Sequence, residues 1–233
     1  MATYKVKNTE LQLRLEPIVS LHDGIPVGFE ALSRVVTCLI SCNSFDYETF
    51  FRSLDKSDCE YVIERQLEIY QKWTRQHPEI YMGKFLFINV HPAILEDSDA
   101  CQRFLPYLRC FSIAIEIDSH LSEMSEKAKA NIAALKTFGV QIWIDDFPGY
   151  GRLSGAFWSG VKIDRWAFQQ SFKSSGDGDE YCDFSVVSNI GPLVIEGIES
   201  KAHLAHAIGL GARYGQGYLW AAHSMLQELH GCK

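Results

Sequence analysis

The sequence predicts an α/β fold, a (β/α)8-type barrel, from three observations. Short runs rich in β-branched and aromatic residues recur along the chain, separated by segments that have the composition of helices or loops. Several runs are apolar almost throughout, as strands buried on both faces of a parallel sheet are. Eight such runs within 233 residues suit a closed barrel, although the chain is short for that fold. An open doubly wound sheet satisfies the alternation too and stays open.

The expected strands follow one another along most of the chain. They are Leu13–Leu21, Pro26–Leu32, Phe85–Val90, Ser112–Ile117, Val140–Asp145, Gly160–Asp164, Leu193–Ile198 and Ala212–Trp220. A tight turn containing Asp23 and Gly24 joins the first two, so one strand near the N-terminus should run antiparallel to its neighbour. The segments between the strands predict helices at Tyr47–Gln76, Leu121–Phe138 and Lys201–Ile208, and a mobile surface loop at Ser174–Glu180.

Composition narrows the class of protein. Hydrophobic residues make up 47% and charged residues 22%, which is ordinary for a globular protein with a core. The net charge of -7 offers no broad basic face to DNA, RNA or an acidic membrane. No apolar run is long enough to span a bilayer, and the N-terminus lacks the apolar core of a signal peptide. The seven cysteines are odd in number and lack CxxC spacing, which indicates reduced thiols and a cytoplasmic location. We expect one domain over residues 1–233.

Acidic or amide side chains stand at or near the carboxyl ends of the predicted strands. They are Glu30, Asn89, Glu116, Asp145, Asp146, Asp164 and Glu196, with Lys162 on one of the same strands. In a barrel those ends meet at one rim. A single buried carboxylate is most simply a salt-bridged core residue, but this many at one relative position indicate a site for a hard cation such as Mg²⁺ or Mn²⁺. The adjacent Asp145 and Asp146 suit a carboxylate bridge between two ions, an arrangement that assists attack on phosphorus.

Seven elements of the sequence resemble, in order, the motifs of the EAL domain family. They are GFEALSR at 28–34, FINVHPAIL at 87–95, IAIEID at 113–118, WIDDF at 143–147, VKID at 161–164, IEGIES at 195–200 and GARYGQGYLW at 211–220. Each is weak by itself, but the ordered set covers nearly the whole chain. The resemblance implies a metal-dependent phosphodiesterase that hydrolyses the bacterial second messenger cyclic di-GMP to linear pGpG.

The resemblance also implies a role for each matching residue. The ligands of two Mg²⁺ or Mn²⁺ ions would be Glu30, Asn89, Glu116, Asp145, Asp146 and Glu196, with Asp145 shared. Lys162 would touch the attacking water, and Glu196 or Glu199 would complete the base and orientation network. Arg34 would contact a phosphate, which a guanidinium suits, and Gln216 would support the far side of the site. From the residues alone, Arg34 could instead pair with a surface acid and Gln216 could cap a turn.

The sequence departs from the family pattern at four places. Ser119 stands where the family has a glutamate that anchors the loop after the paired aspartates. Pro148 stands within that loop, where it fixes φ and removes an amide donor. Glu16 replaces a glutamine and would repel an anionic ligand if it faced the site. The segment after Trp220 lacks the usual proline.

These departures leave three functions open. The first is an active phosphodiesterase, the second a cyclic di-GMP receptor without turnover, and the third a protein-binding regulator that has lost the nucleotide. A homodimer is an expectation from the resemblance alone. The aromatic side chains of Trp143, Phe147, Trp158 and Trp166 are expected in the core rather than against a base.

Overall fold

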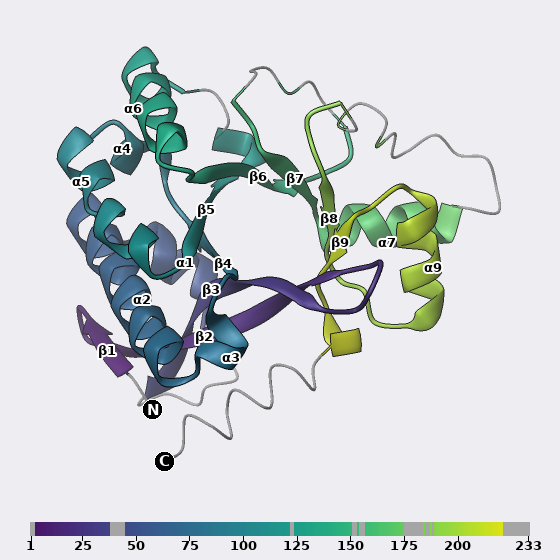
Figure 1. Cartoon of the computed structure of the whole chain (residues 1–233), viewed down its shortest axis with the longest axis horizontal. Helices are drawn as coiled ribbons and strands as arrows, with labels where there is room; N and C mark the ends of the chain where they lie inside the picture. Colours follow the sequence, from purple (N-terminus) through teal and green to yellow (C-terminus); the bar gives the residue numbers. More distant parts are fainter. Residues whose placement is uncertain are drawn as a thin grey trace.

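The fold is a closed barrel of parallel and antiparallel strands. The computed structural model describes residues 3–37, 45–121, 124–150, 153, 157–174, 184, 187 and 189–220. Its nine strands are hydrogen-bonded in chain order from β1 to β9, and β2 also pairs with β9. Strands β2 to β9 therefore form an eight-stranded barrel (Figure 1). The predicted barrel is confirmed, and closure through β2 and β9 excludes the open doubly wound sheet.

The strand bounds differ from the predicted ones mainly at the two ends of the chain. The strands are β1 (Thr3–Val6), β2 (Thr9–Ser20), β3 (Pro26–Thr37), β4 (Phe85–Asn89), β5 (Ser112–Asp118), β6 (Gln141–Phe147), β7 (Gly160–Ile163), β8 (Leu193–Ile195) and β9 (Tyr214–Gly215). β2 runs antiparallel to both of its barrel neighbours and to β1, and every other pairing is parallel. The predicted antiparallel strand is thus β2, while β1 was not predicted.

The last predicted strand, Ala212–Trp220, is wrong in length. Only Tyr214 and Gly215 pair as β9, and Tyr218–Trp220 forms a 3-10 helix. Gly217 explains the break, because its φ is 148° and a Cβ there would lie 2.5 Å from the backbone of Ile198. The chain therefore leaves the sheet directly after Gly215.

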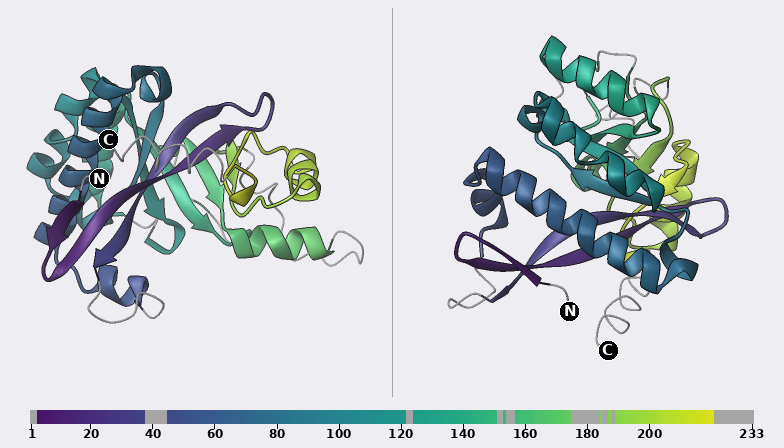
Figure 2. Two further views of the ribbon diagram at one scale, coloured as in Figure 1. Left: turned by 90° about the horizontal axis from the view of Figure 1, so that it is seen from below. Right: turned by 60° about the vertical axis from the view of Figure 1, so that its left-hand side comes forward.

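The β2–β3 hairpin is the longest feature of the sheet. In its turn, Ile25 O accepts from Ser20 N at 2.9 Å, and Asp23 Oδ1 accepts from Ile25 N at 3.0 Å. Figure 2 shows the ribbon running from the end of the molecule that carries β1 to the end that carries α7 and α9. Where it passes beyond the barrel, a second small core forms from Tyr4, Val6, Leu11, Val35 and Val62.

Helices cover the outside of the barrel (Figures 1 and 2). They are α1 (Tyr47–Arg52), α2 (Lys56–Gln76), α3 (Pro78–Tyr81), α4 (Pro92–Leu95), α5 (Ser98–Gln102), α6 (Glu126–Thr137), α7 (Arg165–Ser174) and α9 (Lys201–Gly209). The predicted helix Tyr47–Gln76 is two helices, because Asp55 caps the start of α2 by accepting from Asp58 N at 2.9 Å. None of the described helices combines the length and apolar character needed to cross a bilayer.

The aromatic side chains expected in the core divide into two groups. Trp143, Phe147 and Trp158 are buried, as predicted. Trp166 is 61% exposed, so its predicted burial is wrong. It stands in the first turn of α7, whose inner face is made by the next two residues, Ala167 and Phe168. The predicted loop beyond Ser174 and the segment after Trp220 lie outside the described residues.

Candidate functional site

A buried lysine surrounded by carboxylates lies inside the barrel. Lys162, on β7, is fully buried. Its Nζ lies 2.8 Å from Asp145 Oδ1, 2.8 Å from Glu196 Oε1, 2.9 Å from Glu116 Oε1 and 3.3 Å from Glu30 Oε2. We call this group, together with Asp146, the carboxylate cluster. Its members come from β3, β5, β6, β7 and the residue after β8.

Strand register brings these side chains to one level of the barrel. Asn89, the last residue of β4, stands beside Glu116 in the parallel pairing of β4 and β5. Glu196 follows β8, where its backbone N–H donates to Ile163 O at 3.1 Å. Gln216 follows β9, where its N–H donates to Ile195 O at 2.9 Å. The parallel ladder thus continues just far enough to fix both residues beyond the strand ends.

A β-bulge places two successive carboxylates in the cluster. The pairing of β6 with β7 shifts between Ile144 and Phe147, so that Asp145 and Asp146 both face the stretch of β7 that holds Lys162. In a regular strand, neighbouring side chains point to opposite faces. Asp146 has a φ of 50°, in the left-handed region that costs a non-glycine residue about 1 kcal/mol. Ser119, the residue directly after β5, donates from its Oγ to the backbone carbonyl of Asp146 at 3.0 Å and so holds this turn.

Two amides complete the hydrogen bonding around Glu30. Asn89 Nδ2 donates to Glu30 Oε1 at 3.2 Å and to Glu116 Oε2 at 3.5 Å. Gln216 Nε2 donates to Glu30 Oε2 at 2.6 Å and to Glu16 Oε2 at 3.2 Å. Asn89 therefore presents its amino group to the carboxylates, and it would have to turn its oxygen toward a cation in order to ligate one.

Burial and crowding shift the pKa values of the cluster. Burial raises the pKa of Glu116 well above its usual value and that of Asp145 too, despite the nearby Lys162. Burial also raises the pKa of Glu196 to about 8 and, with the charge of Asp145, that of Asp146 to about 6. Burial acts the same way on Glu30, but there Lys162 and the Gln216 hydrogen bond outweigh it, and the pKa is lowered. The cluster thus carries more carboxylates than one ammonium can compensate.

The ligand chemistry of the cluster fits hard divalent cations. Ligand oxygens form two groups, Glu30 with Glu116 and Asp145, and Asp145 with Asp146 and Glu196, each within 4.8 Å. Asp145 belongs to both. When all five carboxylates are ionised, the single lysine leaves four negative charges uncompensated, and two divalent ions would neutralise them. Oxygen donors of this kind suit Mg²⁺ and Mn²⁺.

Three of the acidic and basic residues singled out in the sequence lie outside the cluster. Glu199 pairs with Arg165, at the start of α7. Asp164 accepts from Ala167 N at 3.0 Å, as a cap of the same helix. Arg34 is exposed on β3, four residues beyond Glu30.

Glu16 was noticed in the sequence as a departure and not as a site residue. It stands directly opposite Glu30 in the β2–β3 pairing, on the same face of the sheet. The sequence held no signal for this pairing, because the register of the hairpin shifts between Ile18 and Val19, and counting outward from the Asp23–Gly24 turn would place Phe29 opposite Glu16.

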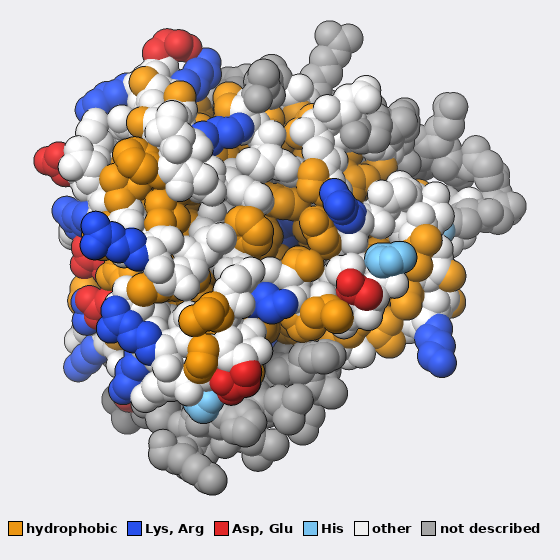
Figure 3. Space-filling model, in the orientation of Figure 1, with side chains coloured by type: hydrophobic (Ala, Val, Ile, Leu, Met, Phe, Trp, Pro, Cys, Tyr) orange, Lys and Arg blue, Asp and Glu red, His pale blue; other side chains and the backbone are white. Residues whose placement is uncertain are grey.

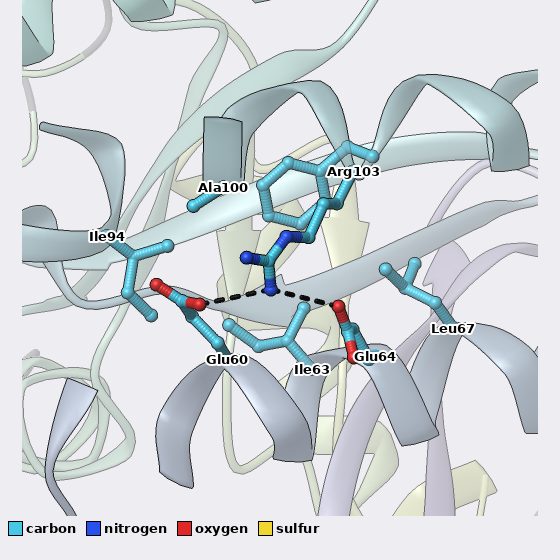
Figure 4. Close-up of a pocket in the computed structure, with 8 residues that line it drawn as sticks. Glu60, Ile63, Glu64, Leu67, Ile94, Ala100 and Arg103 are labelled. Atoms are coloured by element: carbon cyan, nitrogen blue, oxygen red, sulfur yellow. Dashed lines mark hydrogen bonds and ion pairs between the residues drawn. The ribbon is translucent and has the colours of Figure 1, made fainter. Parts of the chain in front are cut away.

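Surface charge differs from this interior arrangement. On the face shown in Figure 3 the acidic side chains are scattered. A shallow hollow between α2 and α5 holds Arg103, whose Nη1 lies 3.1 Å from both Glu60 Oε2 and Glu64 Oε1 over the apolar side chains of Ile63 and Leu67 (Figure 4). That hollow has two carboxylates for one guanidinium, and among the described residues no group of possible metal ligands lies there.

Comparison with known proteins points to one family. The model of the EAL domain family matches residues 2–223. Two relatives from Escherichia coli strain K12 are similar. "Probable cyclic di-GMP phosphodiesterase PdeB" is 25% identical over 93% of this chain and 43% of its own length, and "Probable cyclic di-GMP phosphodiesterase PdeI" is 27% identical over 91% and 28%. The chain spans less than half the length of either relative.

Solved structures share the fold. The complex of PaMucR phosphodiesterase with c-di-GMP has a TM-score of 0.67 at 22% identity, with 90% of each chain covered. The EAL enzyme Bd1971 bound to cAMP and cyclic di-GMP gives 0.67 at 23%, covering 90% of this chain and 61% of the other. Klebsiella pneumoniae BlrP1 in complex with manganese and cyclic di-GMP gives 0.63 at 17%, covering 94% and 57%. At these identities the likeness shows the barrel.

Proposed function

The chain belongs to the EAL domain family, and on that premise we propose that it hydrolyses cyclic di-GMP to linear pGpG with the help of two divalent cations. The observation that carries the proposal is the pair of oxygen groups that share Asp145 beside a buried Lys162. Such a concentration of buried carboxylates is costly unless cations compensate it, and two cations that share a ligand suit displacement at phosphorus.

In this proposal each of the two groups of ligand oxygens holds one cation. Glu30, Glu116 and Asp145, joined by Asn89, would hold one ion, and Asp145, Asp146 and Glu196 would hold the other. Bound Mg²⁺ or Mn²⁺ would supply Lewis acidity toward the phosphodiester and the attacking water.

Lys162 would contribute the positive charge that the protein itself supplies. Its ammonium group has three donors and lies within 3.3 Å of four carboxylates, so it is held rigidly. An ammonium preorganised in a buried site stabilises negative charge that develops during attack more strongly than it would in water.

Glu196 is the better candidate than Glu199 for the base and orientation network. Glu196 lies 2.8 Å from Lys162 and next to Asp145, whereas Glu199 is held by Arg165. Arg34 would contact a phosphate from its exposed position on β3, and Gln216 would support the site by holding Glu30.

The serine at position 119 is compatible with this function. The hydroxyl of Ser119 reaches the carbonyl of Asp146 from the position at which the family has its anchoring glutamate, so the turn after Asp145 keeps a support from the residue that follows β5. A receptor without turnover is the second candidate, and Asn89 favours it, because its amino group rather than its oxygen faces the carboxylates that would hold the first ion. The regulatory protein partner and the homodimer stay predictions.

The test is hydrolysis by purified protein. Cyclic di-GMP is incubated with the protein and Mg²⁺ or Mn²⁺, and pGpG is followed by chromatography. Glu30→Ala should abolish turnover, whereas Glu126→Gln, an exposed change of equal charge on α6, should not. Circular dichroism checks that both variants are folded. Binding without turnover in the wild type would favour the receptor, and neither binding nor turnover would exclude both.

A further inference from the structure

The position of Glu16 beside the cluster has a consequence for cation binding. Glu16 and Glu30 are directly opposite each other across β2 and β3, where like charges repel. The amino group of Gln216 lies between them, 2.6 Å from Glu30 Oε2 and 3.2 Å from Glu16 Oε2. The repulsion is therefore relieved by one shared amide, and on the other side by Arg14, whose Nη2 lies 3.3 Å from Glu16 Oε1.

The two carboxylates fix the orientation of this amide. An ionised carboxylate only accepts hydrogen bonds, so both acceptors demand the nitrogen of Gln216 and exclude its oxygen. Gln216 is 5% exposed, and its Oε1 is buried with no hydrogen-bond partner among the described residues. A buried acceptor of this kind is satisfied by a donor that arrives with water or a ligand.

We propose that Glu16 is a positioning residue that tunes the cation site: it locks Gln216 onto Glu30, and its charge strengthens cation binding at Glu30, Glu116 and Asp145 while weakening binding of the anionic substrate. A glutamine at position 16 could instead donate to Gln216 Oε1, which would release the lock and remove one negative charge beside Glu30. The inference rests on the proposed function only for its substrate part. The cation part stands on the geometry around Gln216.

The experiment titrates Mn²⁺ alone into the folded protein by calorimetry. Glu16→Gln should raise the dissociation constant for Mn²⁺ by about fivefold, the effect of one partly screened charge at this range. Glu16→Asp keeps the charge and should stay within about twofold of the wild type. Glu126→Gln is the control for a change in net charge far from the site.

Turnover at saturating Mn²⁺ adds a second measurement. Glu16→Gln should lower the KM for cyclic di-GMP by about twofold to threefold and change kcat less, because the charge opposes the substrate in its ground state. Equal Mn²⁺ affinity in the wild type and Glu16→Gln, or an equal loss in Glu16→Gln and Glu16→Asp, would overturn the inference. A wild type that binds Mn²⁺ without hydrolysing cyclic di-GMP would instead refute the proposed function, and the titration would still decide the role of Glu16.

Discussion

Two groups of ion pairs in this molecule use the same chemistry in different surroundings. In the hollow between α2 and α5, Arg103 is half exposed and pairs with Glu60 and Glu64, and Lys56 pairs with Glu60 and Asp97. In the carboxylate cluster, Lys162 is 1% exposed and lies among four carboxylates. The surface group has three carboxylates for two cations, and Glu64 and Asp97 are each about a third exposed to water. The cluster has five carboxylates for one lysine, and its inner members Glu30, Glu116 and Asp145 are buried, while Asp146 at its edge is exposed.

The difference indicates which of the two charged groups suits a cation-binding site. Surface ion pairs contribute little to stability, because water and salt screen them. A buried excess of negative charge is unfavourable unless something else compensates it, and here the compensation must come from a bound cation or from protons. An excess of charge among buried carboxylates is therefore more informative about function than the number of ion pairs.

The largest expected effect is the difference in stability between a variant of Lys162 and a variant of Arg103. Lys162→Met keeps the chain length and removes the only cation of the cluster. It should lower the free energy of unfolding by about 3–5 kcal/mol, measured by urea denaturation in EDTA. Arg103→Met should lower it far less, because Glu64 is about a third exposed and Lys56 still lies 3.6 Å from Glu60 Oε1. Similar losses in both variants would contradict the distinction drawn between the groups.

Metal addition should act on the buried group alone. Mn²⁺ at a hundred times its dissociation constant should stabilise the protein by about 2.7 kcal/mol, seen as a rise in Tm that EDTA reverses. Burial raises the pKa of Asp146 to about 6 and of Glu196 to about 8, so protons compete with the ion below these pH values. At one fixed Mn²⁺ concentration, the rise in Tm should therefore be larger at pH 8 than at pH 6.

Two variants check the location of this effect. Glu30→Ala should lose most of the response to Mn²⁺, whereas Glu64→Gln in the surface group should keep it. A response that survives in Glu30→Ala would place the ion elsewhere.

The smallest expected effect concerns the support of Asp146. Ser119→Ala removes the hydrogen bond to the Asp146 carbonyl, worth about 1 kcal/mol, and should weaken Mn²⁺ binding by about fivefold. Ser119→Thr keeps a hydroxyl and should restore most of the affinity, as measured by calorimetry. If both variants bind like the wild type, the hydroxyl does not hold the turn.

The barrel and the level of its acidic residues could be predicted from the sequence because they follow from a repeated pattern. Apolar strands such as Phe85–Asn89 end in a polar residue, and parallel strands bring those ends together. The β-bulge could not be predicted, because Asp145 and Asp146 read as ordinary neighbours until β7 is paired against them. The exposure of Trp166 depends on which face of α7 meets the barrel, a tertiary choice that composition does not specify.

The neighbours of Glu30 were hidden for a different reason. Glu16 and Gln216 are 200 residues apart in the chain and meet only because β2 closes the barrel against β9. The hairpin register decides which side chain of β2 stands opposite Glu30, and a shift of one residue would point Glu16 to the other face.

The narrow seam of the barrel also bears on synthesis. The ladder between β2 and β9 has two residue pairs, Val19 with Gly215 and Ser20 with Tyr214, and it joins the two ends of the described barrel. Such a long loop closes slowly and late. On the ribosome, Glu30, Asn89, Glu116, Asp145 and Lys162 have all been made before Gln216 leaves the exit tunnel, so a nascent chain carries an unclosed sheet edge at β2. Until the final strand arrives, that edge is exposed to pairing with other chains, and a chaperone that shields it would protect the protein at its most vulnerable stage.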